Sequence, residues 1–169
     1  AWDAIYDLKD NDSIPARLEN VKNANVISPT WYKVKNNAGE LESMADVGYV
    51  AYVHNLGYEV WPLVSDFGMK EEIDEGSILS SYESRRALIT NIMNEIKLYG
   101  YDGINIDFEK IKADYSGDYI QFIRELSVEC RRAEVVLSVD NYPPYNFNRY
   151  YNRKAQGECV DYVVVMCYD

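Results

Sequence analysis

Short segments with the apolar, β-branched composition of strands alternate with helical segments along the 169-residue chain. The predicted strands cover residues 25–31, 58–65, 103–109, 135–140 and 161–169, and residues 1–3 have the composition of the end of an earlier strand. The predicted helices cover residues 45–56, 82–99 and 116–132, with shorter helices ending near residues 24 and 156, a turn at 36–39 and a polar loop at 66–81. A helix between two strands returns the chain to the same end of the sheet, so we expect parallel pairing.

Two architectures fit this alternation, a (β/α)₈ barrel and a doubly wound open sheet. The open sheet usually binds phosphates through G-x-G-x-x-G or G-K-[ST] after a strand, and neither pattern follows a predicted strand. Polar side chains instead gather where the predicted strands end: Asp3, Trp31, Asp66, Asp107, Glu109, Asp140, Asn141, Tyr168 and Asp169. That distribution is typical of the active-site face of a TIM barrel. We therefore expect an α/β chain that covers about the first six strands of a (β/α)₈ barrel, an incomplete barrel.

The predicted strand at residues 103–109 has two chemically different faces. Side chains alternate across a strand. One face carries Ile104, Ile106 and Phe108, and the other carries Gly103, Asn105, Asp107 and Glu109. A strand covered on both faces normally has an almost continuous apolar sequence, and an unpaired buried carboxylate costs several kcal/mol. Asp107 and Glu109 therefore indicate a functional site.

Charge and composition restrict the class of ligand. The chain has 17 Lys and Arg against 28 Asp and Glu, a formal net charge of −11, and its basic residues form no stripe, which argues against nucleic acid as a partner. No apolar run approaches the roughly 20 residues that span a bilayer. Cys130, Cys159 and Cys167 lack metal-ligand spacing and are expected to be small buried side chains, while His54 is the only histidine, so we expect no metal and no other cofactor. A neutral substrate fits this composition better.

The central strand resembles the signature D-G-x-[DN]-x-[DN]-x-E of glycoside hydrolase family 18, the chitinase-like enzymes. The matching residues are Asp102, Gly103, Asn105, Asp107 and Glu109. The last predicted strand, V-V-V-M-C-Y-D, resembles the family's second marker M-x-Y-D through Met166, Tyr168 and Asp169. The segments N-V-I-S-P-T-W-Y, G-Y-E-V-W-P-L-V-S and L-S-V-D are similar to the branch found in bacterial sporulation and spore-cortex-lytic glycosylases. One departure is V-S-D-F-G at residues 64–68, where many chitinases have S-x-G-G, and it argues against insoluble chitin as the substrate.

The resemblance implies substrate-assisted catalysis, in which the 2-acetamido oxygen of the sugar attacks its own anomeric carbon. Glu109 is then the single general acid and base. Asp107 is expected to orient the acetamide N–H and to stabilise the oxazolinium-like charge, and Tyr168 to hydrogen-bond the acetamide oxygen. The other expected site residues are Asp169 for the sugar or leaving group, Asn105 in support of Asp107, Trp31 and Met166 as sugar-facing surfaces, and Asp140.

Two of these assignments have a structural alternative. Trp31 follows Pro29, and a tryptophan at such a position is as often part of the core as a sugar platform. Asp140 is equally well explained as a hydrogen-bonding partner inside the fold.

We therefore expect a retaining glycosidase that hydrolyses β-linked N-acetylglucosamine-containing glycans, such as spore-cortex peptidoglycan or chitin-like oligosaccharides. The alternatives are a non-catalytic chitinase-like glycan-binding protein and a scaffold module with an unused site. Glu109 favours the enzyme, because binding-only relatives of the family commonly lose that acid. Such an enzyme is expected outside the cytoplasm, secreted or associated with the spore or cell wall. Residues 1–169 are expected to form one catalytic domain without the last two βα units, and to associate through the open barrel edges or with the missing part.

Overall fold

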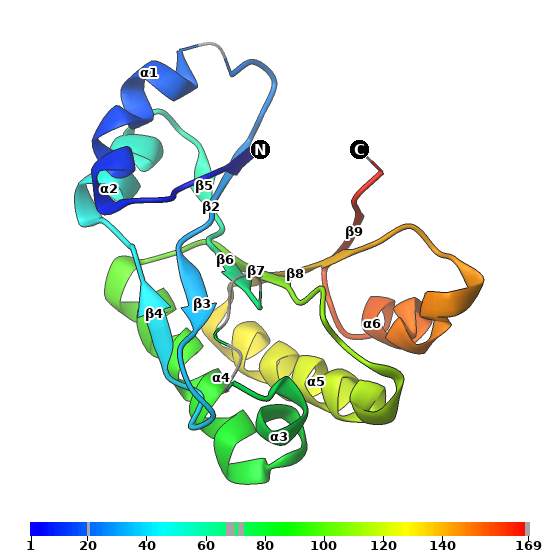
Figure 1. Ribbon diagram of the computed structural model, residues 1–169. Helices are drawn as coiled ribbons and strands as arrows, with labels where there is room; N and C mark the ends of the chain where they lie inside the picture. Colours follow the sequence, from blue (N-terminus) through cyan, green and yellow to red (C-terminus); the bar gives the residue numbers. More distant parts are fainter. Residues whose placement is uncertain (20, 67–69, 71–72, 168–169) are drawn as a thin grey trace.

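The computed structural model describes residues 1–19, 21–66, 70 and 73–167 (Figure 1). Its strands are β1 (Trp2–Asp3), β2 (Val26–Pro29), β3 (Tyr32–Val34), β4 (Leu41–Ser43), β5 (Glu59–Val60), β6 (Leu63–Ser65), β7 (Gly103–Asp107), β8 (Val136–Asn141) and β9 (Tyr162–Val165). Its α-helices are α1 (Ile14–Leu18), α2 (Val47–Asn55), α3 (Glu75–Ser80), α4 (Tyr82–Tyr99), α5 (Ser116–Ala133) and α6 (Arg153–Gly157). Its 3-10 helices are η1 (Leu8–Ser13), η2 (Ala113–Tyr115) and η3 (Asn146–Tyr151).

Parallel pairing joins the strands in chain order. A three-stranded sheet has the order β1-β2-β5, and a six-stranded sheet has the order β4-β3-β6-β7-β8-β9. The described strand pairs are parallel, apart from β3 with β4. β2 and β3 are successive parts of one chain segment, as are β5 and β6. Pro29 and Pro62 lie at these two interruptions, since proline has no N–H to donate to a ladder. Segment 26–34 therefore pairs along segment 59–65, and the two sheets continue each other.

Helices α4 and α5 cover one face of this sheet (Figure 1). α4 ends at Gly100, which takes the left-handed conformation with φ of 68°. The apolar face of β7 lies against the helical layer, because Ile104 and Ile106 are buried and Phe108 stacks on Phe122 of α5 with ring centroids 5.7 Å apart. The polar face of β7 therefore points away from the helices, as the alternation of the sequence predicts.

The sheet curls around its polar face. A pocket of about 280 Å³ is lined by Trp2 of β1, Ser28 of β2, Asn105 of β7, Ser138 of β8 and Val164 of β9. Strands from both ends of the sheet thus border one space. Among the described residues, β1 pairs only with β2 and β9 only with β8, so these strands form a curled sheet and not a closed barrel.

A β-hairpin that the sequence analysis did not predict follows β2. β3 and β4 pair antiparallel around the predicted turn at residues 36–39. Gly39 in this turn has φ of +80°, and a Cβ there would lie 2.7 Å from backbone atoms of Ser84 and Leu88 in α4. The tip of the hairpin therefore packs directly on α4, which only a glycine permits.

Two element boundaries also differ from the prediction. The segment 66–81 was expected to be a loop, but it contains α3, which begins where the Asp74 side chain accepts a hydrogen bond from the Gly76 N–H at 3.1 Å. The first helical segment ends at Leu18 and not near residue 24.

The buried stripe of α2 also differs from the prediction. The helical periodicity of the sequence predicts Val47, Val50, Ala51 and Leu56 as core contacts of this helix. The buried residues are instead Tyr49, Val50 and Val53. Val47 is 71% exposed and Leu56 is 49% exposed. The helix is rotated because Tyr49 faces inward and donates its hydroxyl proton to Asp3 at 2.6 Å. An aromatic ring with a polar end satisfies both the core and a buried carboxylate.

Expectations from composition are met in part. Cys130 is buried as predicted, but Cys159 is half-buried and Cys167 is exposed, and all three are free thiols. No helix within the described ranges is both long enough and apolar enough to cross a membrane.

Candidate active site

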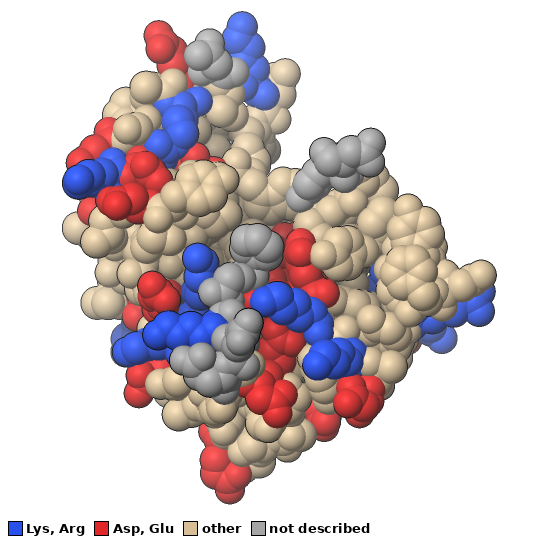
Figure 2. Space-filling model, viewed as in Figure 1, with Lys and Arg blue, Asp and Glu red and all other residues tan. Residues whose placement is uncertain are grey.

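The candidate site lies at the carboxyl end of β7. Asp107 is the last residue of that strand, Glu109 follows two residues later, and both line one pocket of about 270 Å³. The other lining residues are Ala4, Ile5, Tyr6, Thr30, Tyr32, Lys33, Leu63 and Ser65. Figure 2 shows a group of carboxylate side chains at the middle of the face it displays. The two carboxylates predicted from strand alternation therefore open into the same space.

Burial and like charge raise the pKa values of Asp107 and of the neighbouring Asp140. Burial raises the pKa of Asp107 to about 7, and the charges of Asp140 and Glu109 add to the effect. Burial also raises the pKa of Asp140 to about 6, although hydrogen bonds from Asn105 and Trp2 act in the opposite direction. Pocket carboxyl groups with a strongly raised pKa are a feature of functional sites.

Asn105 supports Asp140 and not Asp107, which corrects the prediction for Asn105. Its Nδ2 donates to Asp140 Oδ2 at 2.6 Å, and its Oδ1 accepts from Ser138 Oγ at 2.6 Å. Asp107 Oδ1, in contrast, is buried without a hydrogen-bond partner among the residues that the structure describes. An orphaned buried acceptor next to a pocket is where a ligand donor gains most.

Tyr142 is a site residue that the sequence analysis missed. Its hydroxyl donates to Glu109 Oε2 at 2.6 Å from the loop after β8. Arg153 of α6 holds that loop by donating to the carbonyl of Tyr142 at 2.8 Å and to the carbonyl of Pro143 at 3.4 Å. The available signal was the position of Tyr142 just beyond the end of β8, a place where side chains reach the carboxyl face of the sheet.

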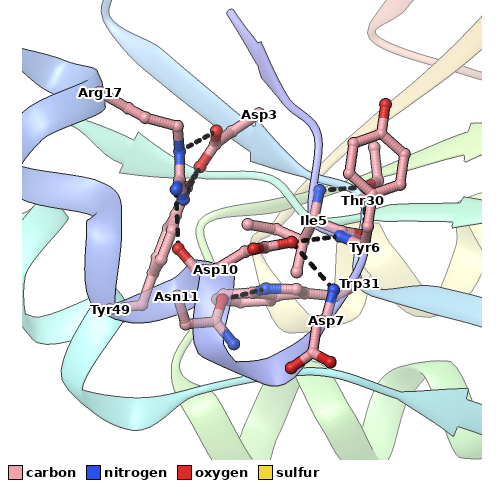
Figure 3. Close-up of polar contacts among 10 residues, drawn as sticks. All are labelled: Asp3, Ile5, Tyr6, Asp7, Asp10, Asn11, Arg17, Thr30, Trp31 and Tyr49. Carbon is pink, nitrogen blue, oxygen red and sulfur yellow. Dashed lines mark hydrogen bonds and ion pairs between the residues drawn. The ribbon is translucent and has the colours of Figure 1, made fainter.

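The wall of the pocket opposite β7 is a well-tethered turn (Figure 3). The Ile5 N–H donates to Thr30 Oγ1 at 2.8 Å. The N–H groups of Tyr6 and Asp7 both donate to Asp10 Oδ2, at 2.8 and 2.9 Å. Tyr6 itself is 87% exposed while its backbone is fixed. An exposed aromatic ring on a fixed backbone beside the pocket is a candidate sugar-stacking surface that the sequence analysis did not single out.

Trp31 is a core residue, so its prediction as a sugar-facing surface is wrong. It is 1% exposed, its indole N–H donates to Asn11 Oδ1 at 2.9 Å, and its ring meets that of Tyr49 edge-on at 4.8 Å (Figure 3). The strand-end carboxylate of Asp3 is also occupied within the fold, by Arg17 at 2.6 and 2.9 Å and by Tyr49. Both side chains stabilise the junction of β1, β2 and α2.

The first two signature residues, Asp102 and Gly103, lie at the opposite, amino end of β7. Asp102 Oδ2 accepts from the Val60 N–H at 2.9 Å and lies 2.8 Å from His54 Nε2. A Cβ on Gly103 would come within 2.8 Å of the Trp61 ring. Asp102 and Gly103 therefore stabilise the amino end of β7 within the fold, and His54 is an exposed residue in the last turn of α2.

The second marker is only partly described. Met166 is 8% exposed, so most of this predicted sugar-facing side chain is covered, and its N–H donates to the Asn141 carbonyl at 2.9 Å. Tyr168 and Asp169 lie outside the described residues. Within the part of the chain that the structure describes, no group of three or more His, Cys, Asp or Glu side chains is arranged to hold a metal ion.

The site thus consists of a half-buried aspartate and, two residues later, a pocket-lining glutamate at the carboxyl end of a curled parallel sheet. Residues 74–169 match the family model described as glycosyl hydrolases family 18. The match covers more than half of the chain, and the chain belongs to this family.

Three known proteins illustrate what this chain is similar to. The cortical fragment-lytic enzyme of Bacillus subtilis (strain 168) is 32% identical over 101 residues, which is 56% of this chain and 23% of that enzyme. The spore cortex-lytic enzyme SleL of Bacillus megaterium QM B1551 has a similar structure, with a TM-score of 0.81 and 16% identity over 100% of this chain and 41% of that one. A chitinase from Chromobacterium violaceum ATCC 12472 gives a TM-score of 0.79 and 17% identity, over 99% of this chain and 55% of that one. The chain thus spans less than a quarter of the curated relative and about half of these solved structures.

Proposed function

We propose that this chain carries the machinery of a retaining glycosidase that hydrolyses β-linked N-acetylglucosamine-containing glycans. The observation that carries the proposal is the common pocket of Asp107 and Glu109 at the end of β7. Membership of glycosyl hydrolase family 18 supports a glycan substrate. The names of the relatives, cortical fragment-lytic enzymes and chitinases, support spore-cortex peptidoglycan or chitin-like oligosaccharides as that substrate.

In this proposal Glu109 transfers the protons. It protonates the glycosidic oxygen as the bond breaks and later removes a proton from the water that attacks the intermediate. Oε2 of Glu109 accepts the hydrogen bond from Tyr142, so Oε1 is the atom that donates the proton to the glycosidic oxygen. The tie from Arg153 to the backbone of Tyr142 keeps this donor in place. The side chain that delivers the proton therefore has one defined orientation.

Asp107 is proposed to act on the 2-acetamido group. Its orphaned Oδ1 can accept the acetamide N–H, which turns the acetamide oxygen toward the anomeric carbon. The oxazolinium-like intermediate carries positive charge, and an ionised Asp107 in a partly buried site stabilises that charge more strongly than the neutral substrate. Tyr168 is proposed for the acetamide oxygen and Asp169 for the same sugar or the leaving group. Asp140 is proposed to contribute through its charge on Asp107 and not through sugar contact.

The fold is proposed to be the first six strands of a (β/α)₈ barrel in one catalytic domain, residues 1–169. The curl that brings Trp2 of β1 and Val164 of β9 to one pocket supports this reading. So does the likeness of the full chain to about half of each larger relative. We propose in addition that the edges at β1 and β9 pair with further β-structure, either from a longer chain or from another copy. The relatives' names favour action at the spore or cell wall, outside the cytoplasm.

Replacing the proton donor tests the proposal. Glu109→Gln keeps the shape of the side chain but cannot transfer the proton, so turnover of chitotetraose and of purified spore-cortex peptidoglycan should fall by about 10² to 10⁴, with binding largely retained. Products are identified by mass spectrometry. Glu158→Gln, at an exposed glutamate, is the matched control and should leave turnover unchanged. Weaker binding with unchanged turnover would refute Glu109 as the proton donor, and sugar binding without any turnover by the wild-type chain would indicate a glycan-binding protein.

The nature of the nucleophile needs a second test. A cello-oligosaccharide, which lacks the 2-acetamido group, should resist hydrolysis. The first product of chitotetraose should keep its anomeric configuration by NMR. Equal hydrolysis of both sugars, or an inverted first product, would exclude substrate-assisted catalysis.

A further inference from the structure

Asp66 is the most deeply buried carboxyl group near the candidate site. It follows β6 directly and is 0% exposed. Its Oδ1 accepts from the Glu109 N–H at 2.9 Å, and its Oδ2 accepts from the Lys110 N–H at 2.7 Å. The Asp66 N–H in turn donates to the Asp107 carbonyl at 3.3 Å. β7 ends at Asp107, and the backbone N–H groups of Glu109 and Lys110 thus bond to the Asp66 side chain and not to a neighbouring strand.

Asp66 does not line the pocket, because Ser65 does and successive side chains on a strand point to opposite faces. The carboxylate lies instead on the helical side, under the loop that carries Glu109. The Tyr115 hydroxyl lies 2.9 Å from the Lys110 carbonyl and 2.9 Å from Glu75 Oε2. The N–H of Glu109 and both backbone polar groups of Lys110 therefore have protein partners, and the loop is held from below by side chains.

The ionisation of Asp66 is linked to Glu75. Burial raises the pKa of Asp66 to about 7, the two backbone N–H groups lower it, and the charge of Glu75 and a hydrogen bond with Glu75 raise it. The nearby Glu75 carboxylate thus favours the neutral form of Asp66. The other titratable groups that interact with Asp66 are Asp107 on β7, Tyr119 on α5, Tyr151 on η3 and Tyr142 on the loop after β8.

We propose that Asp66 is a positioning residue for Glu109: its buried carboxylate fixes the peptide from which the Glu109 side chain projects into the pocket. This inference rests on the proposed function for its consequence in catalysis, but its contacts are testable without activity. A carboxylate that accepts two adjacent N–H groups holds the loop more firmly than a neutral acceptor, because both bonds are charge-assisted. Because burial raises the pKa of Asp66 to about 7, this hold depends on pH near neutrality.

The contacts are tested by NMR on the ¹⁵N-labelled chain between pH 5 and 9. The amide proton resonances of Glu109 and Lys110 should move together as Asp66 ionises. Asp66→Asn should abolish this shared titration, because one amide oxygen can accept only one of the two bonds and its NH₂ faces the other N–H. Glu75→Gln should keep both contacts but lower the pH of the midpoint. Amide titrations unchanged in Asp66→Asn would overturn the inference.

Kinetics then test the consequence. Asp66→Asn should lower kcat for chitotetraose about 10-fold to 100-fold with little change in KM, because a misplaced proton donor affects turnover and not sugar binding. Glu75→Gln should retain kcat at pH 8. If Asp66→Asn fails to fold, as judged by near-UV circular dichroism, the absence of a common titration of the Glu109 and Lys110 amide resonances in the wild-type chain would still refute the proposal. A wild-type chain that shows the titration but no hydrolysis would refute the proposed function and leave the contacts established. Equal losses in kcat and binding in Asp66→Asn would indicate general disruption and overturn the positioning role.

Discussion

Replacing Asp107 by asparagine is expected to stabilise the fold at pH 8 and to leave it nearly unchanged at pH 4, relative to the wild-type chain. The folded state raises the pKa of Asp107 from 3.8 to about 7. Below the lower value both the folded and the unfolded chain are protonated, so Asp107 adds no electrostatic cost. As pH rises from about 4 to about 7, the unfolded chain releases the proton first, and the stability of the fold falls. Asparagine has no proton to lose and avoids this cost.

The magnitude follows from the size of the pKa change. About three pKa units, at about 1.4 kcal/mol each, give a cost of up to about 4 kcal/mol above pH 7. For a domain of this size, each kcal/mol changes Tm by about 2 to 4 °C. A change in packing or hydrogen bonding caused by the amide itself is present at every pH. The informative quantity is therefore the difference in unfolding free energy between Asp107→Asn and the wild-type chain at pH 8, minus the same difference at pH 4. The pH-independent effect of the amide cancels in this subtraction.

Urea unfolding at pH 4, 6 and 8, followed by circular dichroism, measures this quantity. Asp12→Asn, at an exposed aspartate in η1, is the matched control for replacing an aspartate by asparagine. Parallel stability profiles for the wild-type chain and Asp107→Asn would refute the reasoning, because they would mean that the Asp107 carboxyl is not perturbed by folding. Hydrolysis by Asp107→Asn should also be reduced, since the amide cannot stabilise the positive intermediate.

Three further predictions concern the neighbours of the two carboxylates. Asp140→Asn removes a like charge that raises the pKa of Asp107. The acidic limb of the pH profile of kcat/KM should therefore move to lower pH by roughly one unit. An acidic limb at the wild-type pH would show that Asp107 does not control that limb. Tyr142→Phe removes the hydroxyl that donates to Glu109, so kcat should fall about 10-fold with KM unchanged, in line with a hydrogen bond to a charged group; unaltered kcat would make the contact dispensable. Tyr6→Ala should raise KM for chitotetraose roughly 3-fold to 10-fold, because it removes the exposed ring. Tyr6→Phe keeps the ring and should keep the wild-type KM. Equal KM values for the wild-type chain and both variants would exclude sugar stacking at this position.

Most of the fold was predictable from the sequence because it depends on local periodicity. The helix at 82–99 matches α4 without a shift, and the alternation at 103–109 correctly separates the buried Ile104 and Ile106 from the polar face. The hairpin of β3 and β4 was missed because its strands are short and its glycine is required by a contact with α4, which lies about 45 residues later. Local pattern cannot report a constraint imposed by another element.

The candidate site was predictable only where its residues share a strand. Asp107 and Glu109 stand two residues apart, so their common direction follows from the geometry of a strand. Trp31 has the composition of a sugar platform, and its burial is decided by Asn11, 20 residues earlier. The contacts of Glu109 with Asp66 and Tyr142 span 43 and 33 residues and arise from neighbouring strands. Parallel pairing brings such strand ends together, but only the register determines which side chains meet.

The same pairing explains how the chain can hold several acidic groups in one place. Asp66, Asp107 and Asp140 lie at the carboxyl ends of three adjacent strands, β6, β7 and β8. Burial raises the pKa of each of them to between about 6 and about 7. Near neutral pH these groups therefore remain partly protonated, which limits their mutual repulsion. In the proposed reaction, a positive charge that develops on the sugar favours their ionised forms, so the interaction becomes stronger as the reaction proceeds. In this proposal, the raised pKa of Asp107 lowers the unfolding free energy of the domain above pH 7. The same carboxyl group stabilises the positively charged transition state. That relation requires Asp107→Asn to be both more stable above pH 7 and less active, and a variant with only one of the two changes would separate the electrostatics of folding from those of catalysis.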